Sequence, residues 1–358
     1  MASYLSKIGI LNLINSSRNV IILYLILVGW MLRKGKKTIR EVKALAVFSL
    51  YVCSVIFFMH DSKTASWTIL ILSFLLIPLM FYITSNIHWN EIDVKYNGFV
   101  WTIVCNILAL IYITSYPLLV LLIDEPDQRV AAYNSIYFVL STYPFVFLIK
   151  DWRIVVLLSL LPFSSFFISG KTTCLLAGAL ALGIYMISLF KNRKNGILIG
   201  GIIVIGLIIA SLQFDTAELV ASVNEDFDTG GNGRMDIGSV VLSRLFEPTF
   251  FDFVVGHGAD AVSKMLEIGA HNDFLEVLYN YGLIGLSLYI WFCYLLYRKM
   301  LLLPKGSTIR LTYLISLMIF LCASLASKLL GTQVQMLTFA LIWGILNRQQ
   351  IVPSSNKK

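Results

Sequence analysis

The sequence is poor in charged side chains. Only 13% of its 358 residues are Asp, Glu, Lys or Arg, whereas a soluble domain has roughly 25%. Hydrophobic residues make up 58% and the mean hydropathy is +0.80, so a soluble fold of this length could not bury its apolar surface. Apolar runs of about 20 residues, long enough to cross a bilayer, recur along the chain. Because unpaired backbone groups are costly in hydrocarbon, we expect an all-α, polytopic transmembrane helix bundle.

Clustered cysteine is also lacking, which excludes a readable zinc site. Internal repeats of the kind that mark many transporters are absent. No cleavable signal is expected, since Asn12, Asn15 and Arg18 interrupt the first apolar patch. The net charge of +8 comes mainly from short loops, so we expect no nucleic-acid partner. The five cysteines all fall inside apolar runs, at Cys53, Cys105, Cys174, Cys293 and Cys322.

The basic residues indicate the topology. Their densest cluster lies between Arg33 and Lys43 and is cytoplasmic by the positive-inside rule. Alternation from there puts the loop 85–97 inside and the polar stretch 213–270 outside. The chain then divides into an N-terminal bundle (1–212), an external loop (213–270) and C-terminal spans with a cytoplasmic tail (271–358). About 11 to 12 spans are expected, with one crossing or two at the N-terminus: 19–32, 42–59, 67–84, 99–123, 131–149, 154–169, 172–190, 196–212, 272–297, 311–330 and 334–346.

The external loop is too long for a plain connector. Apolar periodicity predicts short helices at 237–246 and 259–268, lying on the outer membrane interface. A polar run, NEDFDTGGNG at 224–233, delivers Arg234. His257 stands between two glycines, which indicates a tight backbone turn.

A cluster of polar residues opens the span after this loop. His271 is followed by Asn272, Asp273 and Glu276, at a membrane edge where polar groups are costly and tend to be functional. The histidine can serve as a general base or as a structural hydrogen bonder at a helix start. If it lies on the helix, the 100° step turns it away from both carboxylates. A metal site would therefore need ligands from elsewhere, and we expect none.

External cations are the candidate anion binders. Arg234 and Lys171 could neutralise a leaving pyrophosphate without metal. The alternatives are a solvated loop arginine and a lysine that snorkels at a helix end. The SGKTT around Lys171 is not a phosphate-binding loop, because Ser165 stands where a glycine is needed and no strand precedes it. Weaker candidates are Arg244, Lys264 and Lys328.

The order of these features resembles the O-antigen polymerase and O-antigen ligase superfamily of bacterial envelopes. The matching pieces are SGKTTCLLAGAL, GNGRMDIG, and VVGHGAD followed by AHNDFLEVLYNYGLIGLSLY. They span roughly 169–291, and the HN piece with the two glycines after it is the most specific.

The resemblance implies a GT-C-like fold and metal-independent, inverting transfer, without a cofactor, from an oligosaccharide linked to undecaprenyl pyrophosphate. It gives catalytic roles to His271, Arg234 and Lys171. The family usually has arginine at the last position, and lysine keeps the charge but loses bidentate geometry. The expected substrate-binding residues are Asn272, Asp273, Glu276 and Arg244.

The resemblance also implies a place and partners. The chain is expected in the bacterial inner membrane, with its active site on the periplasmic side, among membrane lipid and beside a chain-length regulator protein. A polymerase, which extends one lipid-linked repeat unit with the glycan of another, is the first reading. A ligase that transfers the polymer to lipid A core is the alternative. A flippase or transporter of lipid-linked sugars is the alternative from another class.

Overall fold

The computed structural model describes residues 39–59, 66–87, 89–122, 134–190, 234–245, 249–266, 271–327, 329–330 and 332–347. Every regular element within them is helical, as the composition predicts. In chain order these are α2 (Arg40–Met59), α3 (Ser66–Asn86), α4 (Glu91–Leu122), α6 (Ile136–Thr142), η1 (Tyr143–Leu148), α7 (Trp152–Ile168), α8 (Thr172–Phe190), α11 (Arg234–Leu245), α12 (Phe250–Val255), α13 (Ala261–Leu266), α14 (Asp273–Leu302), α15 (Thr308–Ala326) and α16 (Gln333–Asn347).

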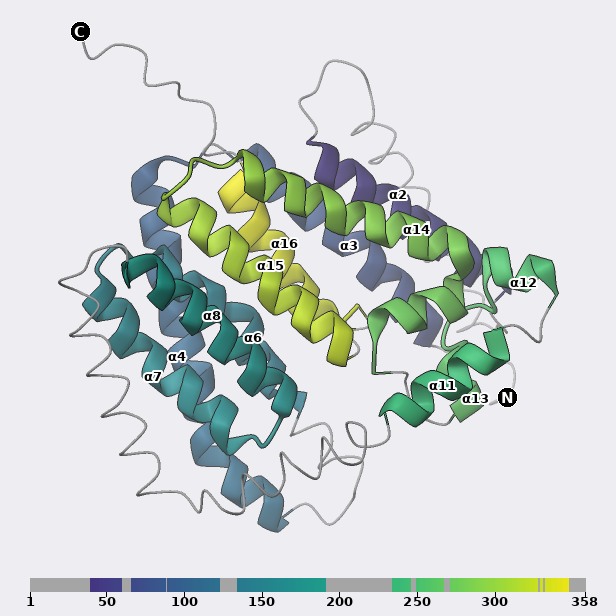
Figure 1. Ribbon diagram of the computed structural model, residues 1–358, viewed down its shortest axis with the longest axis horizontal. Coiled ribbons are helices and arrows are strands. Elements are labelled where there is room, and N and C mark those ends of the chain that lie inside the picture. Colours follow the sequence, from purple (N-terminus) through teal and green to yellow (C-terminus); the bar gives the residue numbers. More distant parts are fainter. Residues whose placement is uncertain are drawn as a thin grey trace, which may run out of the picture.

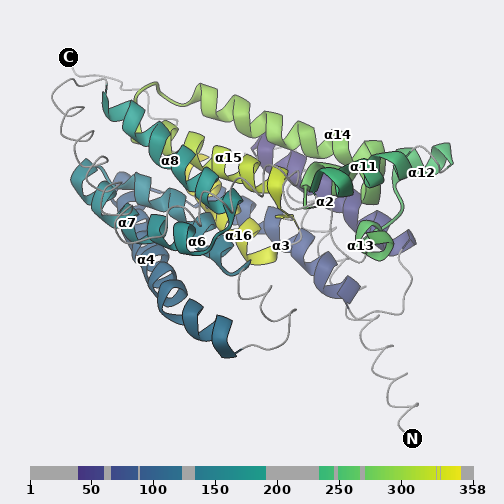
Figure 2. The same cartoon turned by 60° about the horizontal axis from the view of Figure 1, so that its bottom comes forward.

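Helices α15 and α16 lie in the middle of the bundle (Figure 1). Helix α16 packs against α3 and α6, and α15 packs against α8 and η1. On one side of this centre lie α2, α3 and α14, and on the other side lie α4, α7 and α8 (Figure 1). The short helices α11, α12 and α13 all contact α14 and gather at its first turns. The turned view in Figure 2 shows them at the same end of the bundle.

Within the described residues, four helices are long and apolar enough to cross a membrane: α4, α8, α14 and α15. Shorter apolar helices lie at Ser73–Asn86, Ile136–Leu148, Trp152–Ile168 and Val334–Asn347. The predicted segments between 42 and 190 and between 272 and 346 thus coincide with helices. Segments 19–32 and 196–212 and loop residues 213–233 lie outside the described residues. The number of 11 to 12 spans stays a prediction.

The predicted segment 131–149 is helical over 136–148 but changes helix type within it. The chain forms α6 and then the tighter 3₁₀ helix η1, with Pro144 in its first turn. Proline has no N–H to continue an α-helical ladder, which favours the change. Irregular backbone is tolerated at membrane depth only where protein covers it, and every residue of η1 is buried. The predicted loop 85–97 is also too long, because α4 already begins at Glu91.

Helix α14 is broken at Gly282, whose φ of 65° and ψ of −171° are not helical. Carbonyl oxygens before such a break lose the N–H groups four residues ahead, and in a membrane protein each needs another donor. The Tyr51 hydroxyl of α2 lies 3.0 Å from the Tyr281 oxygen before the break and 3.0 Å from the Val255 oxygen at the end of α12. One hydroxyl therefore joins three helices.

The loop Gly256–Gly258 supplies the other donors. The His257 backbone N–H donates to the Tyr279 oxygen at 3.1 Å, and the Gly258 N–H donates to the Asn280 oxygen at 2.9 Å. The His257 ring stacks on the Tyr279 ring, with centroids 4.2 Å apart and planes 6° apart. The expected glycine turn thus exists, and it docks on the broken helix.

The backbone of the loop and the backbone of α14 come into contact at a glycine of each segment. A Cβ at Gly256, where φ is 98°, would lie 2.6 Å from the Gly282 nitrogen, and one at Gly282 would lie 2.6 Å from the Gly256 nitrogen. Real Cβ atoms do not approach backbone this closely, and the left-handed φ also disfavours other residues. Both positions therefore require glycine.

Gly282→Ala should lower the free energy of unfolding by roughly 3 kcal/mol or more, because strain and overlap with the Val254 and Gly256 backbone add. Gly170→Ala, where φ is 61° with open space around it, should cost about 1 kcal/mol from strain alone. Gly183→Ala, also in open space inside α8, should be neutral or stabilising. Unfolding of the purified proteins in detergent measures all three. Equal stability of the Gly282 and Gly183 variants would contradict the close docking.

Tyr51→Phe should destabilise the fold by about 1–2 kcal/mol, because two buried carbonyl oxygens lose their shared donor. Tyr313→Phe is the matched control. The Tyr313 hydroxyl is buried and has no hydrogen-bond partner among the described residues, so its loss should be neutral or stabilising. The same unfolding assay compares the pair, and a Tyr51 variant as stable as the Tyr313 variant would argue against the role of this hydroxyl.

Candidate active site

His271 is exposed and lies just before α14 rather than on it. Its φ is +50°, a left-handed conformation that is uncommon for residues other than glycine. The projection of His271 from the helix therefore does not apply. Asn272 takes the N-cap position, and its side-chain oxygen accepts from the N–H groups of Phe274 at 3.0 Å and Leu275 at 3.2 Å. Asparagine is among the best residues for this position, which explains why the helix starts one residue later.

The two carboxylates point into the protein. Asp273 is 1% exposed and Glu276 is 5% exposed. Both oxygens of Asp273 accept from the backbone N–H of Leu330, at 3.1 and 3.3 Å. This bond ties the start of α14 to the connection between α15 and α16. The role of Asp273 and Glu276 as substrate ligands stays a prediction, and the contact that Asp273 makes is structural.

Lys171 occupies the turn between α7 and α8. Gly170, with φ of 61°, reverses the chain, and Lys171 is half-buried directly before α8. Two residues further along, the Thr173 hydroxyl donates to the Ala326 oxygen at the end of α15, at 3.5 Å. The Lys171 turn and the His271 turn therefore flank the same α15–α16 connection, although 100 residues separate them in sequence.

Arg234 is the first residue of α11, so the polar run 224–233 leads into a helix. Only its backbone lies within the described part of the chain. One turn later, a Cβ added to Gly238 would come within 3.5 Å of the Leu275 side chain of α14. Arg234 thus enters the same end of the bundle as His271. Arg244 lies exposed in the last turn of α11.

A small apolar cluster holds the loop helices on α14. It is separate from the main core and contains residues from α11, α13 and α14. The predicted helices 237–246 and 259–268 thus exist as α11 and α13, while α12 between them was not expected. The buried members of this cluster are Val241, Leu245, Val262 and Tyr279.

The sequence missed some residues that build this end of the molecule. Tyr51 and Leu330 carried no recognisable signal, because a tyrosine and a leucine in apolar runs are expected to be core residues. Gly282 did carry a recognisable signal, because an isolated glycine inside a helical pattern usually has a packing reason.

Lys171, Arg234 and His271 belong to segments at the same end of the bundle, and their meeting in one site stays a prediction. Within the described residues, no group of three or more His, Cys, Asp or Glu side chains could hold a metal ion. His271 is an exposed imidazole at this end of the bundle, and together with Lys171 and Arg234 it would fit proton transfer next to an anionic group.

Residues 157–290 match the family model described as O-antigen ligase. The match runs from α7 through the Lys171 turn, α8 and the loop helices to the second half of α14. It includes Lys171, Arg234 and His271, and both glycines of the helix break. No curated protein matches the chain.

Proposed function

Because the chain belongs to the O-antigen polymerase and ligase superfamily of membrane glycosyltransferases, we propose that it is an O-antigen polymerase. It transfers a growing glycan from undecaprenyl pyrophosphate to an acceptor sugar of another lipid-linked repeat unit. The observation that carries the proposal is the exposed, left-handed His271 beside a connection that also meets the Lys171 turn. Non-glycine residues in this conformation cluster at functional sites.

His271 is the general base. Its neutral imidazole accepts the proton of an acceptor sugar hydroxyl while that oxygen attacks the anomeric carbon. The bond from this carbon to the pyrophosphate oxygen breaks at the same time, and attack from the opposite face inverts the anomeric centre. The electron pair leaves on the pyrophosphate, and the imidazolium later gives its proton to solvent.

Lys171 and Arg234 stabilise the leaving group. Negative charge grows on the pyrophosphate as the bond breaks, and fixed cations lower the energy of that state without a metal ion. Arg234 can hold two phosphate oxygens at once through its planar guanidinium, whereas Lys171 acts as a point charge. Arg244, exposed in the last turn of α11, meets the more distant part of the lipid-linked donor.

The polar start of α14 positions the base. Asn272 caps the helix through its side chain, and Asp273 anchors that end to Leu330. Together they fix the backbone that directly follows His271, which is how they act on the acceptor sugar indirectly. The buried Glu276 lies one turn further along the same helix.

The site belongs at the outer edge of the membrane. The last turns of α14 carry Arg298 and Lys299, which mark the inner edge of the membrane by the positive-inside rule. The exposed large apolar side chains of α14 begin at Leu283, directly after the break, and the described residues 273–281 carry none. His271 then lies beyond the span, on the side that charge alternation makes periplasmic.

The ligase is the second candidate, because the matching family model carries that description. It needs the same base and the same pyrophosphate ligands, and differs only in its acceptor, lipid A core. Nothing in the shared chemistry separates the two acceptors.

His271→Asn should lower glycan transfer by about 10²- to 10⁴-fold, because the base is lost while asparagine tolerates a positive φ. The assay uses purified protein and lipid-linked repeat units. Ser243→Ala is the control, since it truncates an exposed side chain of α11 in the same loop that has no role in the proposed reaction. Full transfer by a stable His271→Asn protein would remove the base assignment, whereas absence of transfer by the wild type as well would favour the transport alternative.

Deletion of the gene should leave lipopolysaccharide that carries a single repeat unit on its core, because repeat units are still ligated but not extended. A lipopolysaccharide gel of the deletion strain reads this directly, with the complemented strain as control. Bare core together with accumulated lipid-linked polymer would identify the ligase instead.

A further inference from the structure

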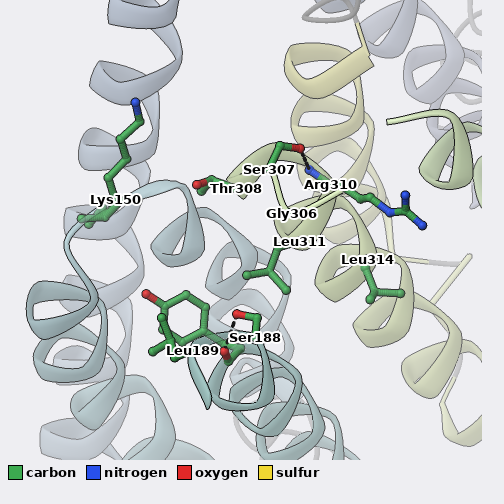
Figure 3. Close-up of a pocket in the computed structure, with 11 residues that line it drawn as sticks. Lys150, Ser188, Leu189, Gly306, Ser307, Thr308, Arg310, Leu311 and Leu314 are labelled. Carbon is green, nitrogen blue, oxygen red and sulfur yellow. Dashed lines mark hydrogen bonds between the residues drawn. The ribbon is translucent and has the colours of Figure 1, made fainter. Parts of the chain in front are cut away.

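A cavity of about 340 Å³ lies at the end of the bundle opposite His271. It opens between the last turn of α8, the residues after η1, and the first turns of α15. Figure 3 shows Leu189 and Leu311 on one side of it and the Thr308 hydroxyl and the Lys150 side chain on another. The proposed glycosyl transfer uses none of these residues.

The cavity lies at the level of lipid headgroups. Helices α8 and α15 have 19 residues each, a length of about 28 Å that matches the hydrocarbon core. Leu189 lies at the end of α8 and Thr308 at the start of α15, so the cavity lies where the hydrocarbon ends. Its inner wall is apolar, formed by Ile149, Leu189, Leu311 and Leu314.

The polar groups of the cavity are donors. Tyr185 is only 4% exposed and lines the cavity, and no described residue forms a hydrogen bond with its hydroxyl. The first N–H groups of α15, at Thr308 and Ile309, have no acceptor within the helix. The side chain of the N-cap residue Ser307 accepts from the Arg310 N–H instead. A helix start also carries partial positive charge.

The positive side chains around the cavity are partly compensated by the groups that they contact. The Lys150 ammonium forms a 2.6 Å hydrogen bond with Glu91, which also pairs with Lys95 at 3.2 Å. This bond raises the pKa of Lys150, so the ammonium stays charged at neutral pH. Arg310 donates to the Leu303 oxygen at 3.2 Å, and its guanidinium points away from the cavity (Figure 3).

One further residue faces this region: Asp151 follows Lys150 and caps α7 by accepting from the Arg153 N–H. The residues around the cavity thus offer hydrogen-bond donors and the Lys150 ammonium, whose charge is partly neutralised by Glu91. Such a site suits an anion with one negative charge better than a phosphate monoester or a diphosphate.

We propose that this cavity binds the phosphodiester headgroup of an anionic phospholipid in the leaflet at this end of the bundle. The phosphate oxygens accept from the Tyr185 hydroxyl, the N-terminal N–H groups of α15 and the Lys150 ammonium. An acyl chain lies along Leu189 and Leu314. A free phosphate ion shares the anionic chemistry but cannot use the apolar wall.

Native mass spectrometry of the full-length protein in detergent tests the proposal. The probes are dioleoylphosphatidylglycerol, zwitterionic dioleoylphosphatidylethanolamine and inorganic phosphate. The wild type should retain phosphatidylglycerol about tenfold more tightly than phosphatidylethanolamine. Tyr185→Phe and Lys150→Gln should each weaken that binding by about fivefold to tenfold, the loss of one hydrogen bond to a charged group.

Lys95→Gln is the matched control, because Lys95 pairs with the same Glu91 but does not line the cavity. It should bind phosphatidylglycerol as the wild type does. Equal retention of the two lipids, or equal binding by the Lys150 and Lys95 variants, would overturn the proposal. Displacement of phosphatidylglycerol by millimolar inorganic phosphate would also overturn it, since the ligand would then be a free anion. Each variant's unfolding temperature shows whether a loss of binding reflects a loss of fold.

Discussion

Backbone groups inside a membrane protein must be paired, and this constraint explains how the loop helices are held on the bundle. The break at Gly282 removes the helical partners of the carbonyl oxygens before it, and in hydrocarbon each orphaned group would cost several kcal/mol. The loop Gly256–Gly258 and the Tyr51 hydroxyl replace those partners. Helix α14 can break only because the loop docks there, and the loop is held only because the helix breaks. The two parts therefore form one structural unit.

The break also divides α14 into two parts that lie in different surroundings. After Gly282, α14 presents a row of exposed large apolar side chains that begins at Leu283. Before it, the helix carries buried carboxylates and contacts α11, α12 and α13. His271 lies directly before this polar part, next to the capped start of the helix. Its own backbone is left-handed. A proposed base that is accessible, while its acidic neighbours are buried, can exchange protons with a substrate without opening the core.

Much of the helical layout could be predicted, because bilayer-length apolar runs leave few alternatives to helices. The segment 172–190 was predicted with the same ends that the structure has. The segment 131–149 was not, since one proline changed the backbone ladder inside a buried region. The candidate site was predicted as residue types, but its geometry was not. The helical projection applied only if His271 lay on the helix, and the cap formed by Asn272 leaves His271 outside it.

The sequence by itself determined that the chain is suited to a lipid bilayer, that its fold is helical, and which residues are candidates for the site. Hydropathy, charge position and local motifs are properties of neighbours in the chain. Only the tertiary structure decided that Lys171 and His271 flank one connection, that Asp273 points inward to Leu330, and that two glycines 26 positions apart touch. Contacts between distant segments depend on how helices pack and on which backbone groups remain unpaired, and no local pattern carries that information.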